Sequence, residues 1–136
     1  MPTGELIKPP RKYWIGVCLA AAFVLFGLVA TLGIAVRDPA TINAQLGFTP
    51  DLPFWLLLGV AIFGEIAGIF GLFMRRAWAT PPFGLSVIFT LLYYAYVLTK
   101  NGWQSPVGPI IITLLHVVLL WFAVVSARRG WTRRGV

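Results

Sequence analysis

Four long runs of apolar residues divide the chain, and each is long enough to cross a bilayer as a helix. The runs cover about residues 13–36, 54–74, 81–98 and 106–126. The first run is too long for the core of a signal peptide, and no small-residue cleavage site follows it. The pattern therefore predicts one all-α membrane domain over residues 1–136, an integral four-helix bundle, with an outer loop at 37–53 and a basic tail at 127–136.

Prolines mark several of the predicted helix starts. Thr80, Ser105 and Asp38 each stand directly before a proline, which is the arrangement of an N-cap residue followed by the first helical position. Gly47 then marks a helix end in the outer loop. We therefore expect a short helix over residues 39–46 within that loop, and an ordinary ordered loop is the alternative.

Composition agrees with a membrane protein. Hydrophobic residues make up 59% of the 136 residues, and only four residues are acidic. A soluble domain of this size could not bury so much apolar surface. The single cysteine, Cys18, excludes an intrachain disulfide, a CxxC redox pair and a cysteine-based zinc site.

Basic residues gather on one side of the predicted bundle. That side carries nine of them: Lys8, Arg11, Lys12, Arg75, Arg76, Arg128, Arg129, Arg133 and Arg134. The other side carries Arg37 and Lys100, together with Asp38 and Asp51. The positive-inside rule predicts cytoplasmic N- and C-termini and a multi-pass protein of the cytoplasmic (inner) membrane. The basic tails then contact anionic lipid headgroups, so the high pI does not indicate a nucleic-acid partner.

One carboxylate, Glu65, interrupts the second apolar run. It lies eleven residues after Phe54, about 16 Å into the membrane at the helical rise, near the midplane. His116, the only histidine, lies ten residues after Pro106, about 15 Å deep on a helix of the same direction. An unpaired ionised carboxylate at that depth costs at least about 3 kcal/mol. Glu65 must therefore point inward and be protonated or paired.

We expect a polar core in which Glu65 and His116 share one depth in the membrane. Four hydroxyl-bearing residues lie at a similar depth, namely Thr90, Tyr93, Tyr94 and Thr113. Such a core would bind a ligand or handle a proton. The alternatives are a structural clasp that fixes helix register, and a Glu65 that faces a partner chain without contacting His116. No metal site is expected.

Three glycines lie beside Glu65 on the same predicted helix. Gly64, Gly68 and Gly71 recur at intervals that place small residues on one helical face. Small residues let helices approach closely in lipid, where burial away from water supplies no driving force. We expect the helix over 54–74 to be the central packing helix, within its own bundle rather than in a homodimer.

Two stretches, AQLGFTPDLPFW and GEIAGIFGLFMRRAWA, resemble the DoxX-like membrane proteins. The features that carry the resemblance are Glu65, Gly68, Gly71 and the pair Arg75 and Arg76. The resemblance implies a four-helix bundle whose glycine-rich second helix holds a buried acid. The family includes small membrane subunits of quinone-linked oxidoreductases, and many members carry loose labels such as sugar transporter. Some relatives use cysteine pairs, which this chain lacks, so a thiol-redox role is not expected.

The chain carries no nucleophile-elbow, P-loop, dinucleotide or zinc motif, so we expect no catalytic activity of its own. We predict a small subunit or accessory factor of a larger membrane complex, of a respiratory, quinone-linked kind. The alternative is a small solute or proton transporter, oligomeric, that uses Glu65 and His116. No cofactor is predicted, although a quinone or a lipid stays open as a ligand. The expected partners are membrane lipids and either other membrane subunits or further copies of the chain.

Overall fold

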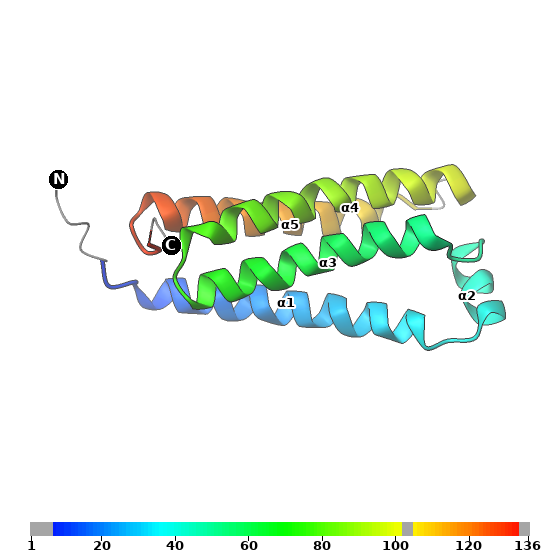
Figure 1. Cartoon of the computed structure of the whole chain (residues 1–136), viewed down its shortest axis with the longest axis horizontal. Helices are drawn as coiled ribbons and strands as arrows, with labels where there is room; N and C mark the ends of the chain where they lie inside the picture. The colour runs from blue at the N-terminus through cyan, green and yellow to red at the C-terminus, as the bar shows by residue number, and fades with distance from the viewer. Residues whose placement is uncertain (1–6, 102–104, 134–136) are drawn as a thin grey trace.

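The computed structural model describes residues 7–101 and 105–133, and this part of the chain is all-α. Four long helices lie side by side, and a short one crosses the end of the bundle between the first two (Figure 1). The elements are α1 (Arg11–Ala35), α2 (Pro39–Leu46), α3 (Leu52–Phe73), the 3₁₀ turn η1 (Ala77–Ala79), α4 (Thr80–Asn101) and α5 (Val107–Arg128). The short helix predicted in the first loop is thus confirmed as α2.

The four long helices are long and apolar enough to cross a membrane, which makes the chain a multi-pass membrane protein. Their ends lie one to three residues from the predicted ones. The start of α3 shows the cause of one difference. The Asp51 carboxylate accepts a hydrogen bond from the Phe54 backbone N–H at 3.3 Å, so the helix begins at Leu52 rather than at Phe54.

The helix caps match the sequence expectation at one of three sites. Asp38 caps α2, since its carboxylate accepts a backbone hydrogen bond at 3.0 Å, and Gly47 ends α2 at φ 76°. The predicted Thr80 cap is wrong because η1 runs directly into α4 and leaves Thr80 in helical conformation. The predicted Ser105 cap is wrong as well, because Pro106 takes the N-cap position of α5 and no side chain caps that end.

The long helices form a ring in the order α1, α3, α4, α5, and α3 packs most extensively on α4. The glycine face of α3 makes this contact. An added Cβ at Gly64 would lie 2.6 Å from the Pro82 carbonyl oxygen, and one at Gly68 would lie 2.7 Å from the Phe83 ring. An added Cβ at Gly71 would lie 2.9 Å from a side chain of η1. The glycine face is therefore filled by the neighbouring helix of the same chain.

We call the half of the bundle where α1 begins and α5 ends the basic half, and its interior is solidly packed. Its core cluster contains Tyr13, Val17, Ala20, Val24, Ile69, Leu72, Ala79, Phe83, Leu119 and Ala123. The fully buried Tyr13 hydroxyl donates a hydrogen bond to the Leu72 carbonyl oxygen at 2.6 Å. Its ring stacks on Phe122 with a centroid distance of 5.8 Å. These contacts join α1, α3 and α5 within the basic half.

Arg75 ties both terminal segments to the turn that follows α3. Its guanidinium donates to the Trp131 carbonyl oxygen at 3.0 Å and to the Ile7 carbonyl oxygen at 2.9 Å. The segment after α5 also pairs with this turn, because the Arg133 backbone N–H donates to the Arg75 carbonyl oxygen at 2.7 Å. Arg134, which the predicted basic tail includes, lies outside the described residues. Arg75 is thus engaged with backbone carbonyls rather than only with lipid headgroups.

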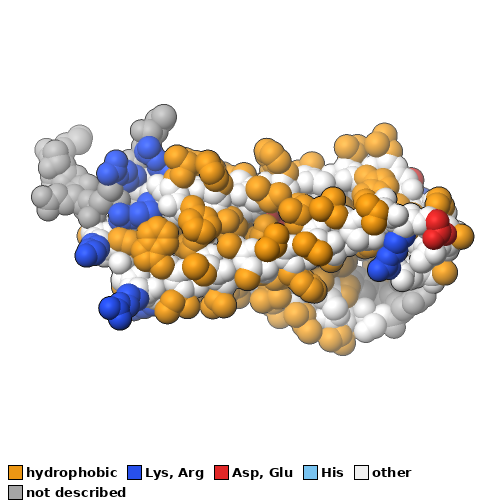
Figure 2. Space-filling view, turned by 90° about the horizontal axis from the view of Figure 1, so that it is seen from below, with side chains coloured by type: hydrophobic (Ala, Val, Ile, Leu, Met, Phe, Trp, Pro, Cys, Tyr) orange, Lys and Arg blue, Asp and Glu red, His pale blue; other side chains and the backbone are white. Residues whose placement is uncertain are grey.

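Large apolar side chains cover the sides of the bundle, and Lys and Arg gather at the end where α1 begins (Figure 2). Among the exposed apolar residues are Leu25, Phe63 and Trp121, each at least 61% exposed. A surface of this kind is stable only against acyl chains or against other membrane helices. The membrane helices therefore contact lipid.

Candidate functional site

Glu65 and His116 meet in the middle of the bundle. Glu65 Oε1 contacts His116 Nε2, and the side chains are 6% and 7% exposed, respectively. Glu65 projects from α3 and His116 from α5, which lie diagonally across the ring of helices. The sequence placed the two residues at one depth, and the tertiary structure brings their side chains into contact.

The hydrogen bonds of His116 define the protonation of the pair. Nδ1 lies 2.6 Å from the Ile112 carbonyl oxygen, and since a carbonyl only accepts, Nδ1 carries a hydrogen. The contact between Nε2 and Glu65 then needs one more proton. Either a protonated Glu65 donates to neutral His116, or a cationic His116 donates to the carboxylate. The pair is electrically neutral in both forms, which is what burial at mid-membrane depth requires.

Two further side chains hold the pair in place. The buried Ser86 hydroxyl on α4 donates to Glu65 Oε1 at 3.5 Å, a long and weak hydrogen bond. The Phe23 ring of α1 packs edge-on against the His116 imidazole at a centroid distance of 5.5 Å. Ser86 was not predicted from the sequence. Its position could have indicated a role, because Ser86 lies one helical turn before Thr90 on the same face of α4.

A cavity of about 220 Å³ borders the pair on the side away from the basic half. All four long helices line it, and Glu65 and His116 form its polar floor. Thr90, Tyr93 and Tyr94 from α4 also line it, as the predicted polar core requires. For comparison, an engineered 150 Å³ protein cavity holds benzene. The cavity is therefore large enough for a small aromatic molecule.

Thr113 is not part of this cavity. It lines a separate groove of about 350 Å³ between α4 and α5, of which Tyr94 forms a shared wall. Although Thr113 lies one helical turn from His116, its helical position turns it toward α4 instead of toward the bundle centre. Thr113 thus lies beside the polar core rather than in this cavity, and its role as a binding residue stays a prediction.

Aromatic rings lie between the cavity and the end of the bundle that carries α2. Phe54 is fully buried there, and its ring lies 5.7 Å from that of Phe48 and 5.3 Å from that of Tyr93. Tyr93 is itself a cavity wall. The ring contact between Tyr93 and Phe54 therefore lies beside the cavity, on the α3–α4 side of this end.

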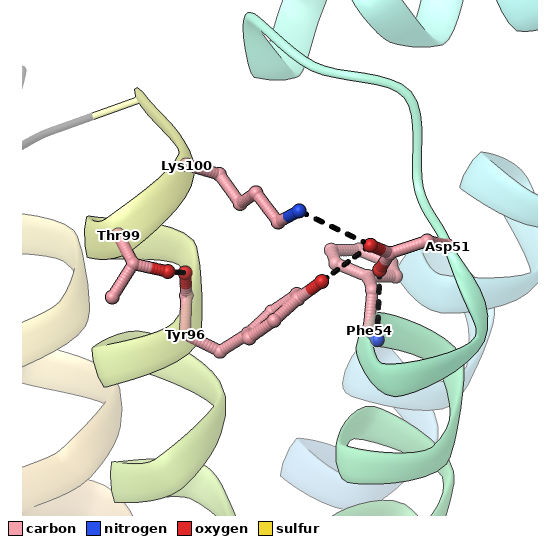
Figure 3. Close-up of polar contacts among 5 residues, drawn as sticks. All are labelled: Asp51, Phe54, Tyr96, Thr99 and Lys100. Atoms are coloured by element: carbon pink, nitrogen blue, oxygen red, sulfur yellow. Dashed lines mark hydrogen bonds and ion pairs between the residues drawn. The ribbon is translucent and has the colours of Figure 1, made fainter.

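A polar cluster lies just beyond these rings and joins the start of α3 to the end of α4 (Figure 3). The Asp51 carboxylate accepts a hydrogen bond from the Tyr96 hydroxyl and lies 3.3 Å from Lys100 Nζ. Three interactions hold the pKa of Asp51 below its usual value. The hydrogen bond from Tyr96 has the largest effect, and the Phe54 N–H and Lys100 have smaller ones. The sequence analysis treated Asp51 and Lys100 only as charges on one side of the membrane.

Comparison with protein-family models, with curated proteins and with solved structures finds no match for this chain. The structure supports a small protein with four membrane-spanning helices. The DoxX-like resemblance rests on the sequence motifs alone and stays a prediction. In the described part of the chain, no group of three or more His, Cys, Asp and Glu side chains could hold a metal ion.

The groups brought together at the site are capable of proton exchange. A carboxyl group and an imidazole that share one proton can accept or release it at the cavity floor with only a small rearrangement. The Thr90, Tyr93 and Tyr94 side chains supply hydroxyl groups on the cavity wall. The rest of the lining is mainly apolar, so a bound molecule would make few polar contacts.

Proposed function

We propose that this multi-pass membrane protein binds a small, hydrogen-bonding molecule in the cavity between its four long helices. The Glu65–His116 pair would contact the polar group of that molecule and exchange a proton with it. This is the ligand-binding form of the transporter predicted from sequence, and in a cell it would act in solute or proton transfer.

One observation carries the proposal, namely that the buried pair borders open space. A clasp that only fixes helix register is best packed on every side, because a void beside it removes contacts. Here Glu65 and His116 instead form the floor of a cavity of about 220 Å³. Buried ionisable groups at the floor of an apolar cavity are the usual arrangement of a binding site.

The charge distribution supports an orientation for the protein. Its basic end would face the cytoplasm and the cavity would lie in the outer half of the cytoplasmic membrane. The subunit of a larger quinone-linked complex, predicted from the sequence, stays a prediction. No contact in the described chain favours it over ligand binding.

A binding measurement with 2-naphthol tests the proposal. This neutral aromatic alcohol is of suitable size, and its fluorescence reports whether its hydroxyl group has left water. We expect saturable binding to the purified full-length protein in micelles. Gly27 lines the cavity and an added Cβ there meets nothing within 4 Å, so the Gly27→Leu side chain would fill the cavity. We expect this variant to bind at least about tenfold more weakly, equivalent to about 1.4 kcal/mol.

Gly33→Leu is the matched control for that measurement. Gly33 lies on the same helix, also has open space around an added Cβ, and is not part of the cavity lining. Its affinity for 2-naphthol should equal that of the unmodified protein. Glu65→Gln should weaken binding, since glutamine holds no exchangeable acid proton. Equal affinities in the Gly27 and Gly33 variants would refute the cavity as the binding site.

A further inference from the structure

The weakest side of the helix ring is the one between α1 and α5. These two helices approach each other closely over only a short stretch. Within the basic half, an added Cβ at Gly16 would lie 2.6 Å from the Phe122 ring. The Phe23–His116 ring contact follows at the level of the cavity floor. The close contacts described between α1 and α5 thus lie at or below the floor.

Above that floor, cavity-lining residues of both helices are exposed at the membrane-facing surface. Phe26 of α1 is 74% exposed and Ile112 of α5 is 38% exposed, although both line the cavity. Ala30, one turn after Phe26, is exposed and lines the cavity as well. Residues that are at once cavity wall and outer surface mark the rim of an opening.

Packed side chains lie below the cavity and at its opposite end, on the side of the α3–α4 contact. The packed core of the basic half lies below Glu65 and His116. The rings of Phe54 and Tyr93 lie at the opposite end, and the Asp51–Tyr96–Lys100 cluster lies beyond them (Figure 3). At the level of the floor and below it, the glycine face of α3 brings α4 into close contact. The side between α1 and α5 has the weakest contact of the helix ring and also carries the exposed rim residues, so the opening fits there best.

We infer that the cavity opens sideways into the hydrocarbon of the membrane between α1 and α5, and that its ligand is a neutral molecule dissolved in the lipid. The opening follows from the exposed rim residues, while the identity of the ligand rests on the proposed function. A water-dissolved, charged solute would have to cross hydrocarbon to reach this opening, at a cost of several kcal/mol.

The lining agrees with a neutral ligand. Glu65 and His116 together carry no net charge, and no Lys, Arg or Asp occurs among the cavity-lining residues of the described chain. A charged ligand would therefore lack a counter-ion. An apolar ring or short chain that bears one hydroxyl or carbonyl group would place its apolar part against Phe23 and Phe26 and its polar group at the floor.

Photolabelling from the lipid phase tests the opening directly. The full-length protein is reconstituted in phosphatidylcholine vesicles in which one acyl chain carries a diazirine at its middle. After irradiation, mass spectrometry of the digested protein locates the adducts. We expect an adduct on Glu65, which the diazirine product attacks readily as a carboxyl group, in addition to adducts on lipid-facing residues such as Phe63.

A bulky residue at the rim should close the opening. We expect the Glu65 adduct to fall to background in Ala30→Trp and to persist in Gly33→Trp, which lies outside the cavity. The opening is refuted if Phe63 is labelled in the unmodified protein and Glu65 is not, a result that needs no variant to fold. Because no soluble ligand is used, failure here is distinct from a failure to bind 2-naphthol.

Discussion

At the residue scale, the defining feature of this protein is a carboxyl group and an imidazole that hold one proton between them. The Ile112 carbonyl oxygen accepts the hydrogen of His116 Nδ1. The other ring nitrogen, Nε2, contacts Glu65. The charged form of either residue would be costly to bury alone at this depth, whereas the two residues together are electrically neutral. The pair therefore tolerates burial beside the cavity.

The stability of two Glu65 variants should differ. In Glu65→Gln the amide N–H can donate to His116 Nε2, so we expect little loss of stability. In Glu65→Leu the buried Nε2 loses its partner, and the free energy of unfolding should fall by about 1–3 kcal/mol. Chemical unfolding in micelles measures both values.

Ser86→Ala is the control for that comparison. Its hydrogen bond to Glu65 is long, at 3.5 Å, and its loss should change the free energy of unfolding by no more than about 0.5 kcal/mol. If Glu65→Leu proved as stable as Glu65→Gln, the contact would contribute nothing to holding α3 and α5 together.

At the scale of the helices, the contact between α3 and α4 depends on the absence of side chains. Gly64→Ala would put a methyl group 2.6 Å from the Pro82 carbonyl oxygen, which belongs to the backbone and cannot rotate away. We expect this overpacking to lower the free energy of unfolding by about 1–3 kcal/mol.

Gly59→Ala serves as the comparison on the same helix. Nothing lies within 4 Å of an added Cβ at Gly59, so this variant should be neutral or more stable by up to about 1 kcal/mol, because alanine favours helix. Unfolding of both variants in the same detergent gives the difference. Equal stability of the two would contradict the close α3–α4 approach.

The cluster around Asp51 predicts a dependence of stability on pH. Hydrogen bonds, first that from Tyr96, lower the pKa of Asp51 in the folded protein from its usual 3.8. The unfolded chain thus takes up a proton at higher pH than the folded chain does. The stabilisation is present above the unfolded pKa of about 4 and is lost as the pH falls through the lower folded pKa.

Asp51→Asn separates this contribution from the others. Asparagine can still cap α3 but cannot titrate, so the fall in melting temperature between neutral pH and about pH 3 should be smaller in this variant. Asp38, whose pKa is lowered chiefly by the Thr41 hydroxyl, is present in both proteins and cancels in the comparison. Identical pH profiles would show that the Asp51 cluster does not stabilise the fold.

At the scale of the whole molecule, both termini of the bundle lie at the end where Lys and Arg gather (Figures 1 and 2). We predict that this end faces the cytoplasm. A green fluorescent protein fused to the C-terminus should fluoresce, while an alkaline phosphatase fused there should be inactive. Reversal of the basic charges at Arg128 and Arg129 alone should leave this result unchanged, since Lys8, Arg11 and Lys12 keep their positive charge on the same side. An active phosphatase fusion would refute the orientation.

Some residues that pack the bundle form a visible pattern in the sequence, and others do not. Gly64, Gly68 and Gly71 were visible as a small face because helical periodicity groups them. Gly16, which lets α1 approach Phe122, stands alone in the first apolar run and gave no such signal. Ser86 and Tyr96 were not predicted either, because each acquires its role only from a residue far away in the sequence, Glu65 and Asp51, respectively.

The sequence by itself determined the class of the protein, its four membrane-spanning helices, the short helix after Asp38 and the shared depth of Glu65 and His116. These features depend on hydropathy, local capping and the rise per residue, which act along the chain. Only the tertiary structure decided that Glu65 meets His116, that Thr113 faces elsewhere, and that a cavity lies beside the pair. Those features depend on the rotation of each helix about its axis and on the packing between helices, which interactions across the bundle set.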